Sequence, residues 1–169
     1  MADLDIFEDA LLTVFDYHQP AHGDPGSDST YTHTQLPSWC DVNGTRTVQY
    51  RIPNTTSTNT KLFAHHQWDA GIHLANLLAS AVSGDGPAWA DPRAKCVVEL
   101  GAGTGLPGLV AAALGARSTV LTDYPDTEIL ANLAANAAAL KKRAPLLLPL
   151  QTMGLAWGDA AQEAYVVVC

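Results

Sequence analysis

The stretch from Cys96 to Ala116, CVVELGAGTGLPGLVAAALGA, constrains the fold more than any other part of the chain. It opens with an apolar run that does not alternate, as expected for a parallel strand buried on both faces. Glycines then occupy every second position, at Gly101, Gly103 and Gly105, before an alanine-rich helical stretch. Glycine accepts backbone angles that other residues avoid, and the first turn of a helix has unpaired amides. The stretch therefore predicts a strand, a ligand-binding turn and a helix.

The same alternation of strand and helix continues toward the C-terminus. Residues 118–124 (STVLTDY) predict a second buried strand, and residues 125–143 predict a helix with acid in its first turn and base in its last. A third strand is expected within residues 144–153 and a fourth within residues 163–169, which include the run YVVVC. This βαβ spacing indicates the α/β class with a mainly parallel sheet.

Smaller elements are predicted ahead of this region. Residues 46–52 (RTVQYRI) alternate in the manner of a half-buried strand, and residues 61–65 are expected to return as the second strand of a β-hairpin. An amphipathic helix is predicted over residues 67–82, broken by the glycines and proline of residues 83–87.

The N-terminal quarter is expected to be set apart from the rest. Residues 4–17 carry a short helical pattern, and residues 18–37 are rich in Pro, Gly, Ser, Thr and His, which predicts a surface loop. We therefore expect two parts: an N-terminal helix and flexible segment over residues 1–45, and an incomplete ligand-binding domain over residues 46–169.

Charge and cysteine content exclude several classes of protein. The formal net charge is −8, which disfavours binding to nucleic acid phosphates or anionic membranes. The three cysteines, Cys40, Cys96 and Cys169, have no metal-ligand spacing, so no metal site is expected. The N-terminus is acidic where a signal peptide needs basic residues, and no apolar run is long enough to span a membrane. We expect a protein of the cytoplasm or nucleus.

The spacing around the glycine turn selects among nucleotide ligands. The glycines read GxGxG, whereas the dinucleotide fingerprint is GxGxxG, and no P-loop lysine follows. Glu99 stands two residues before the first glycine and suits a positively charged ligand, such as the sulfonium of S-adenosylmethionine. Asp123, at the end of the next predicted strand, is placed to accept from ribose hydroxyls. A nicotinamide-cofactor oxidoreductase, and a plain strand-to-helix turn whose glycines serve packing, remain as alternatives.

Longer matches identify a family resemblance. The segments ELGAGTGLPGLVAAALGA, VLTDYPD and ILANLAAN resemble the class I S-adenosylmethionine-dependent methyltransferases. HHQWDAGIHLANLL and GLAWGD narrow the resemblance to the group of eukaryotic protein-lysine methyltransferases and fungal nicotinamide N-methyltransferase-like proteins. One fungal branch of that group methylates translation elongation factor 1-alpha at its N-terminus and a nearby lysine.

The resemblance implies a Rossmann-like sheet of seven strands in the order 3-2-1-4-5-7-6. This chain would supply strands one to four, with an N-terminal β-hairpin and helix before them. Because the chain stops at the fourth expected strand, we expect a truncated form that on its own turns over poorly or not at all. The edge of such a fourth strand would be unpaired and apolar.

The resemblance also implies cofactor-binding roles for individual residues. The methionine end would contact Glu99 and the backbone of Gly101, Ala102 and Gly103, with Trp68 closing that side. The ribose would contact Asp123, and the adenine would pack on Trp157 with Asp159 nearby. From spacing alone, Trp68 and Trp157 could instead be ordinary buried aromatics, and Asn132 and Asn136 are expected to be surface or locally bonded residues.

The implied reaction is methyl transfer from S-adenosylmethionine to an amine. Displacement at carbon needs a positioned, unprotonated nitrogen and no nucleophilic side chain, so no catalytic residue is named. His65 and His66 are considered as a pair of histidines that could act as a general base, and this role is not favoured. The acceptor would be a lysine or N-terminal amine of a protein, such as a translation elongation factor, or a nicotinamide-like small molecule. The alternative is a catalytically inactive remnant that binds cofactor or a partner.

Overall fold

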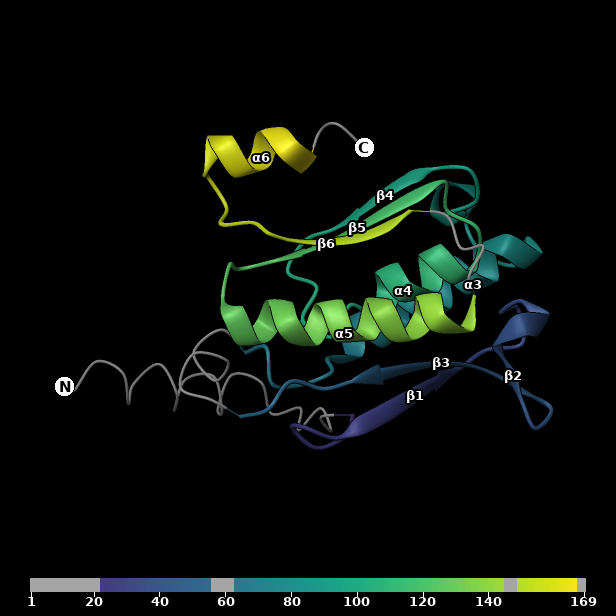
Figure 1. The fold of residues 1–169 in the computed structure, drawn as a ribbon. Helices are drawn as coiled ribbons and strands as arrows, with labels where there is room; N and C mark the ends of the chain where they lie inside the picture. The colour runs from purple at the N-terminus through teal and green to yellow at the C-terminus, as the bar shows by residue number, and fades with distance from the viewer. Residues whose placement is uncertain (1–21, 56–62, 145–148, 167–169) are drawn as a thin grey trace, which may run out of the picture.

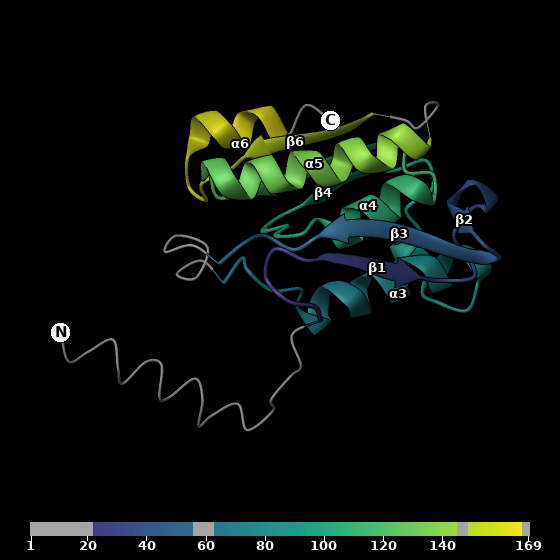
Figure 2. The same ribbon diagram turned by 60° about the horizontal axis from the view of Figure 1, so that its bottom comes forward.

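The computed structural model describes residues 22–55, 63–144 and 149–166. Its layers contain a parallel sheet of β4 (Cys96–Glu99), β5 (Ser118–Asp123) and β6 (Leu150–Gly154), and an antiparallel sheet of β1 (Asp28–Thr32), β2 (Asp41–Val42) and β3 (Thr45–Arg51). Helices α4 (Leu106–Ala113) and α5 (Thr127–Arg143) lie between the two sheets and contact both (Figure 1). Helix α3 (Asp69–Ser83) packs against α4, as the turned view in Figure 2 also shows.

The parallel sheet confirms the first three strands and the two helices predicted for the C-terminal part. Strand β5 pairs with β4 on one side and β6 on the other, both in parallel register. Helix α5 begins after Asp126, whose side chain accepts hydrogen bonds from two amides of the first turn, and ends in three basic residues. Capping and charge both favour a helix at this place. The α/β class is therefore confirmed.

The fourth predicted strand is wrong. Residues Ala160–Val166 form helix α6, and residues 167–169 lie outside the described part. The Asp159 side chain accepts from the backbone amides of Ala161 and Gln162, and the Glu163 carboxylate accepts from the amide of Gly158. These local caps, with helix-favouring Ala, Gln and Glu residues, outweigh the β-branched ending.

The parallel sheet is covered unequally, which corrects the expectation that CVVEL is buried on both faces. Helices α4 and α5 cover one face of the parallel sheet (Figure 1). Within the described residues, the short helix α6 lies over the other face. Val98 is 37% exposed and Leu100 is 58% exposed. The apolar run thus indicates a strand of a parallel sheet, but within the described residues this strand is only partly buried.

The N-terminal sheet differs from the predicted hairpin. Strand β3 is confirmed, but it pairs antiparallel with β1, which lies inside the segment expected to be loop. This pairing joins residues on both sides of the boundary expected at residues 45 and 46. Residues 63–66 form turns rather than a returning strand, while residues 61–62 and the helix predicted over residues 4–17 lie outside the described part. The strand-forming sequence STYT, with Tyr31 buried, was obscured by its Pro- and Gly-rich surroundings.

Helix α3 confirms the amphipathic helix and carries the chain toward the parallel sheet. It ends at Gly84, which takes the left-handed conformation (φ 87°) and donates its amide to carbonyls of the last turn.

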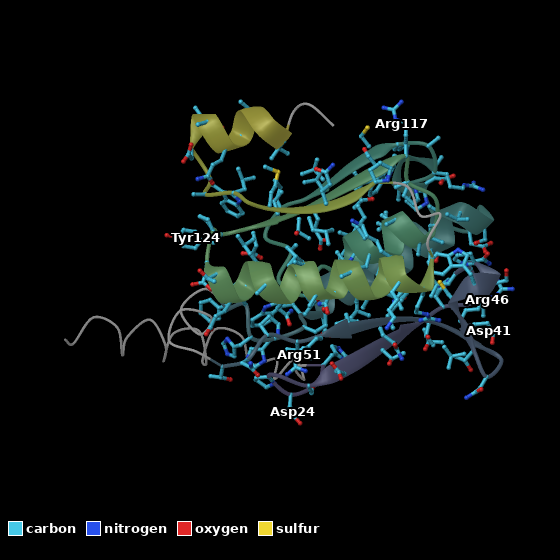
Figure 3. The ribbon with its side chains drawn as sticks, in the orientation of Figure 1. Asp24, Asp41, Arg46, Arg51, Arg117 and Tyr124 are labelled. Carbon is cyan, nitrogen blue, oxygen red and sulfur yellow. The ribbon has the colours of Figure 1, made fainter. Side chains whose placement is uncertain are left out.

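The two ends of the molecule are marked by different elements. Asp41 and Arg46 lie in the β2–β3 hairpin at one end, and Tyr124 follows β5 at the other (Figure 3). Among the described residues, no helix is long and apolar enough to cross a membrane.

Candidate functional site

The glycine turn joins β4 to α4 in a conformation that requires glycine. Gly101, Gly103 and Gly105 all have positive φ, at 61°, 53° and 77°. A Cβ on Gly105 would lie 2.7 Å from the Leu133 side chain, so this glycine serves packing in the core. A Cβ on Gly103 would meet nothing within 4 Å. The middle of the turn therefore borders open space that a ligand can enter.

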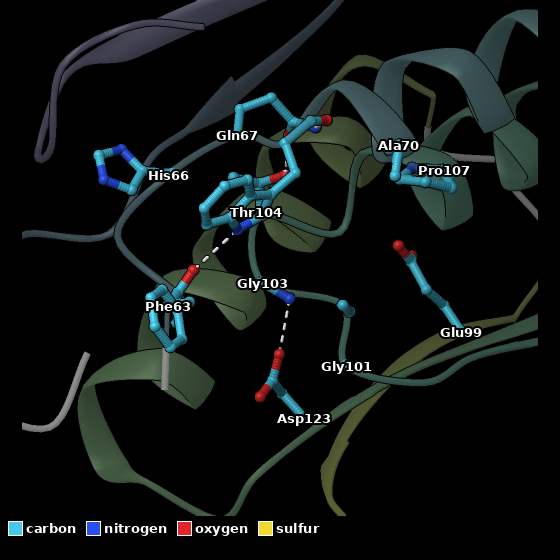
Figure 4. A pocket seen from close by; sticks show the side chains of 14 residues that line it. Phe63, His66, Gln67, Ala70, Glu99, Gly101, Gly103, Thr104, Pro107 and Asp123 are labelled. Carbon is cyan, nitrogen blue, oxygen red and sulfur yellow. Dashed lines mark hydrogen bonds between the residues drawn. The ribbon is translucent and has the colours of Figure 1, made fainter. Parts of the chain in front are cut away.

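Asp123 ends β5 directly beside this turn. One carboxylate oxygen accepts a hydrogen bond from the Gly103 amide at 2.6 Å (Figure 4). The other oxygen accepts from the Tyr124 amide at 2.7 Å. Each oxygen retains a lone pair for a further donor, such as a ligand hydroxyl. Asp123 thus both holds the turn and faces the space in front of it.

Glu99 lies at the end of β4 and faces the first turn of α4. Its carboxylate accepts from the Gly108 amide at 2.8 Å. Burial raises the pKa of Glu99 to about 8, repulsion from Asp123 adds to that rise, and the hydrogen bond from Gly108 opposes it. A positive ligand group at this place would favour the ionised carboxylate and lower the pKa again.

Two adjoining cavities meet at the turn. The first lobe has a volume of about 310 Å³ and lies among the segment before α3, the glycine turn, Glu99 and Asp123. The second lobe, of about 320 Å³, is lined by Gly101, Asp123, Tyr124, Leu155 and Trp157. Gly101 and Asp123 line both lobes. The arrangement suits an elongated ligand whose middle passes Asp123.

The first lobe has a distinct charge. Its described lining contains two carboxylates, Glu99 and Asp123, and no lysine or arginine. The aromatic side chains of Phe63 and Trp68 also line this lobe. Carboxylates and aromatic faces attract cations and repel anions. This lobe therefore suits a cationic or amine-bearing ligand.

The residues predicted for the site are brought together with one exception. The first lobe is lined by Trp68, Glu99, Gly101, Ala102, Gly103 and Asp123, and the second by Trp157. Trp68 is 46% exposed and Trp157 is 77% exposed. The alternative that these tryptophans are ordinary buried aromatics is therefore wrong. Asp159 lines neither described lobe and instead caps α6.

His66 lines the first lobe, and His65 lies beside it. The rings of His65 and His66 lie 4.0 Å apart, and His66 makes an edge contact with Trp68 at 5.5 Å. Burial lowers the pKa of His66, and repulsion from His65 lowers it further. The imidazole of His66 is therefore held toward its neutral form. Within the described chain, no group of three or more His, Cys, Asp or Glu side chains is placed to hold a metal ion.

Sequence reasoning missed the buried polar residues behind the turn. Gln67, Thr104 and Asn136 are each only 3% exposed. Asn136, expected at the surface or in local hydrogen bonds, instead donates to the distant carbonyls of Arg51 and Thr104. Two signals were available in the sequence. Thr104 is a polar residue between two turn glycines, and Gln67 directly precedes the tryptophan at the start of α3. Neither signal identifies the residue to which the side chain bonds.

Comparison with known proteins identifies a family. The sequence profile of the family described as lysine methyltransferase matches residues 50–167. The protein N-terminal and lysine N-methyltransferase efm7 of Schizosaccharomyces pombe is 36% identical over 121 residues, which make up 72% of this chain and 42% of the relative. A Yarrowia lipolytica protein of the same name is 32% identical over 127 residues, or 75% of this chain and 42% of the relative.

The match to these relatives is partial in length. The chain spans less than half the length of the two curated relatives, since it covers 42% of each. A solved structure assigned as an RNA methyltransferase of Pyrococcus horikoshii is 26% identical, with a TM-score of 0.38 over 54% of this chain and 40% of that one. That structural likeness is too weak to carry an argument.

Proposed function

Because this chain belongs to the lysine methyltransferase family, we propose that it binds S-adenosylmethionine in the two-lobed cavity and serves methyl transfer to a protein amine. The observation that carries the proposal is that the two lobes meet at Gly101 and Asp123. A nucleoside joined to an amino acid has its ribose in the middle, where a hydroxyl-accepting carboxylate is needed. The negative first lobe is suited to the sulfonium and ammonium groups at the other end.

Each part of the cavity offers a matching contact. The exposed indole of Trp157, with Tyr124 and Leu155, offers apolar surface for the adenine. The Asp123 carboxylate accepts the ribose hydroxyls, and Glu99 offsets positive charge at the methionine end. The open space in front of Gly103 leaves room for the ligand to approach the backbone closely. When bound, the cofactor supplies a methyl group made electrophilic by its sulfonium.

The protein's share in transfer is to hold and desolvate an unprotonated amine. Phe63 and Trp68, which are 52% and 46% exposed, offer apolar surface at the first lobe, and neutral His66 adds no positive charge there. The relatives named as protein N-terminal and lysine N-methyltransferases support a protein substrate. The translation elongation factor suggested by sequence resemblance, and the cytoplasmic or nuclear location, stay predictions.

The first test is thermal unfolding of the purified chain with S-adenosylmethionine, its demethylated product S-adenosylhomocysteine, or NAD. We expect the unfolding temperature to rise with the first two and not with NAD, because a ligand that binds only the folded state stabilises it. Stabilisation by NAD alone would favour the oxidoreductase alternative and contradict the proposal.

The second test separates an enzyme from a cofactor-binding remnant. The chain is incubated with methyl-labelled cofactor and peptides that carry a free N-terminus, a lysine, both, or neither, with nicotinamide as the small-molecule comparison. Label on the amine-bearing peptides, even at the low rate expected of a truncated chain, is the result that the methyl-transfer proposal predicts. Cofactor binding without label on any acceptor would support the remnant alternative.

A further inference from the structure

Gln67 and Thr104 form a buried polar contact between two separate parts of the cavity wall. The Thr104 hydroxyl donates to the Gln67 side-chain carbonyl, across 37 residues of sequence. The Gln67 amide donates to the Trp68 carbonyl at 2.9 Å. Both side chains are 3% exposed, so their polar atoms have little access to water. The contact links the segment that carries Trp68 to the glycine turn.

Thr104 is the one polar side chain in the turn formed by residues 101–105. Its neighbours Gly103 and Gly105 both have positive φ and have no side chain with which to fix the turn. The Thr104 carbonyl also accepts from the Asn136 amide at 2.8 Å. The turn is therefore held through Thr104 from two sides, by the segment before α3 and by α5.

Gln67 has little freedom to move away. A Cβ placed on Gly71, in the first turn of α3, would lie only 2.5 Å from the Gln67 amide nitrogen. The absence of a side chain at Gly71 thus leaves just enough room for the amide. A flexible polar side chain confined in this way acts as a rigid spacer between Trp68 and the turn.

The contact belongs to one lobe only. Gln67 and Thr104 both line the first lobe, with Glu99 and Trp68, and neither lines the second lobe with Trp157. A change in this contact should alter the first lobe and leave the second intact.

We propose that Gln67 and Thr104 are positioning residues that fix the Trp68 backbone relative to the glycine turn and so determine affinity for the amino-acid end of the cofactor. This inference rests on the proposed cofactor. It differs from a general role in stability, because it predicts an effect on one end of the ligand alone.

The test compares two probes by calorimetry on the 169-residue chain. S-adenosylhomocysteine occupies both lobes, whereas 5′-methylthioadenosine has the nucleoside and sulfur without the amino-acid end. We expect Thr104→Val, which keeps the shape but loses the hydroxyl, to weaken S-adenosylhomocysteine about tenfold and methylthioadenosine less than about twofold. Thr104→Ser keeps the hydroxyl and should restore affinity.

A second variant keeps the test independent of one substitution. Gln67→Met retains length and removes both hydrogen bonds, so it should show the same selective loss if Thr104→Val does not fold. Equal weakening of both probes, or no weakening of either, would overturn the inference while the cofactor assignment stands. A wild-type chain that binds neither probe would overturn the cofactor assignment, and this inference would fall with it.

Discussion

Asn136 of α5 binds both backbone groups of Arg51 at the end of β3. Its side-chain oxygen accepts from the Arg51 amide at 2.7 Å, and its side-chain nitrogen donates to the Arg51 carbonyl at 2.9 Å. Strand β2 pairs with β3 only at Thr45 and Arg46, so Asn136 takes the place of a neighbouring strand at this edge. The same nitrogen reaches the Thr104 carbonyl, which ties the N-terminal sheet to the glycine turn.

Removing this amide should destabilise the fold. Asn136→Ala leaves the Arg51 amide and the Thr104 carbonyl without this buried partner, and we expect a loss of about 3 kcal/mol in the free energy of unfolding. Asn132→Ala is the matched control, because Asn132 is less buried and donates to the same Arg51 carbonyl through a solvent-exposed hydrogen bond. In urea unfolding, Asn132→Ala should lower the free energy of unfolding by only about 0.5 kcal/mol. Equal losses for the two variants would contradict the role given to Asn136.

The raised pKa of Glu99 predicts a pH dependence of stability. Because the pKa rises from 4.5 to about 8 in the folded state, the folded protein holds this proton more tightly than the unfolded chain. The resulting stabilisation is complete below pH 4.5 and is lost as pH rises toward 8, by at most about 1.4 kcal/mol per pH unit. In urea unfolding, the free energy of unfolding of Glu99→Gln should change less with pH over this range than that of the wild-type chain.

The control for that profile is Glu128→Gln, which removes an exposed carboxylate from the first turn of α5. The free energy of unfolding of this variant should depend on pH as it does in the wild-type chain. A wild-type profile as flat as that of Glu99→Gln would refute the assignment of the proton to Glu99.

A methyl group at Gly103 should affect ligand binding more than folding. Gly103 and Gly84 both have positive φ and no atom within 4 Å of an added Cβ. Changing either to Ala should cost about 1 kcal/mol of stability through backbone strain. Only Gly103→Ala places its methyl in the cavity, so it alone should weaken S-adenosylhomocysteine, by about tenfold in calorimetry. Loss of affinity in Gly84→Ala as well would indicate an indirect effect.

Trp157 should matter for the ligand and hardly for the fold. It is 77% exposed, and Trp89, outside both lobes, is 72% exposed. Changing either to Ala should alter the free energy of unfolding by less than about 0.5 kcal/mol. Trp157→Ala should weaken 5′-methylthioadenosine about tenfold, since aromatic stacking on a base contributes about 1–3 kcal/mol. Undiminished binding would remove Trp157 from the proposed adenine site.

Local features account for what the sequence alone determined. The glycine spacing from Gly101 to Gly105 predicted the strand, turn and helix, because positive φ and unpaired helix amides depend only on adjacent residues. The same holds for α3, α5 and the three parallel strands. Asp123 was predictable because the carboxyl ends of neighbouring parallel strands meet at one edge of a sheet.

Only the tertiary structure decided which buried polar groups meet. The contacts of Asn136 with Arg51 and of Thr104 with Gln67 span 85 and 37 residues, and no periodicity encodes them. Whether an amide is exposed or buried depends on which elements pack over it, so Asn136 resembled a surface residue in the sequence. Helix α6 was missed for a related reason: the caps from Asp159 and Glu163 outweighed a valine run that resembled a strand. The sequence thus determined the glycine turn, and packing determined what holds it in place.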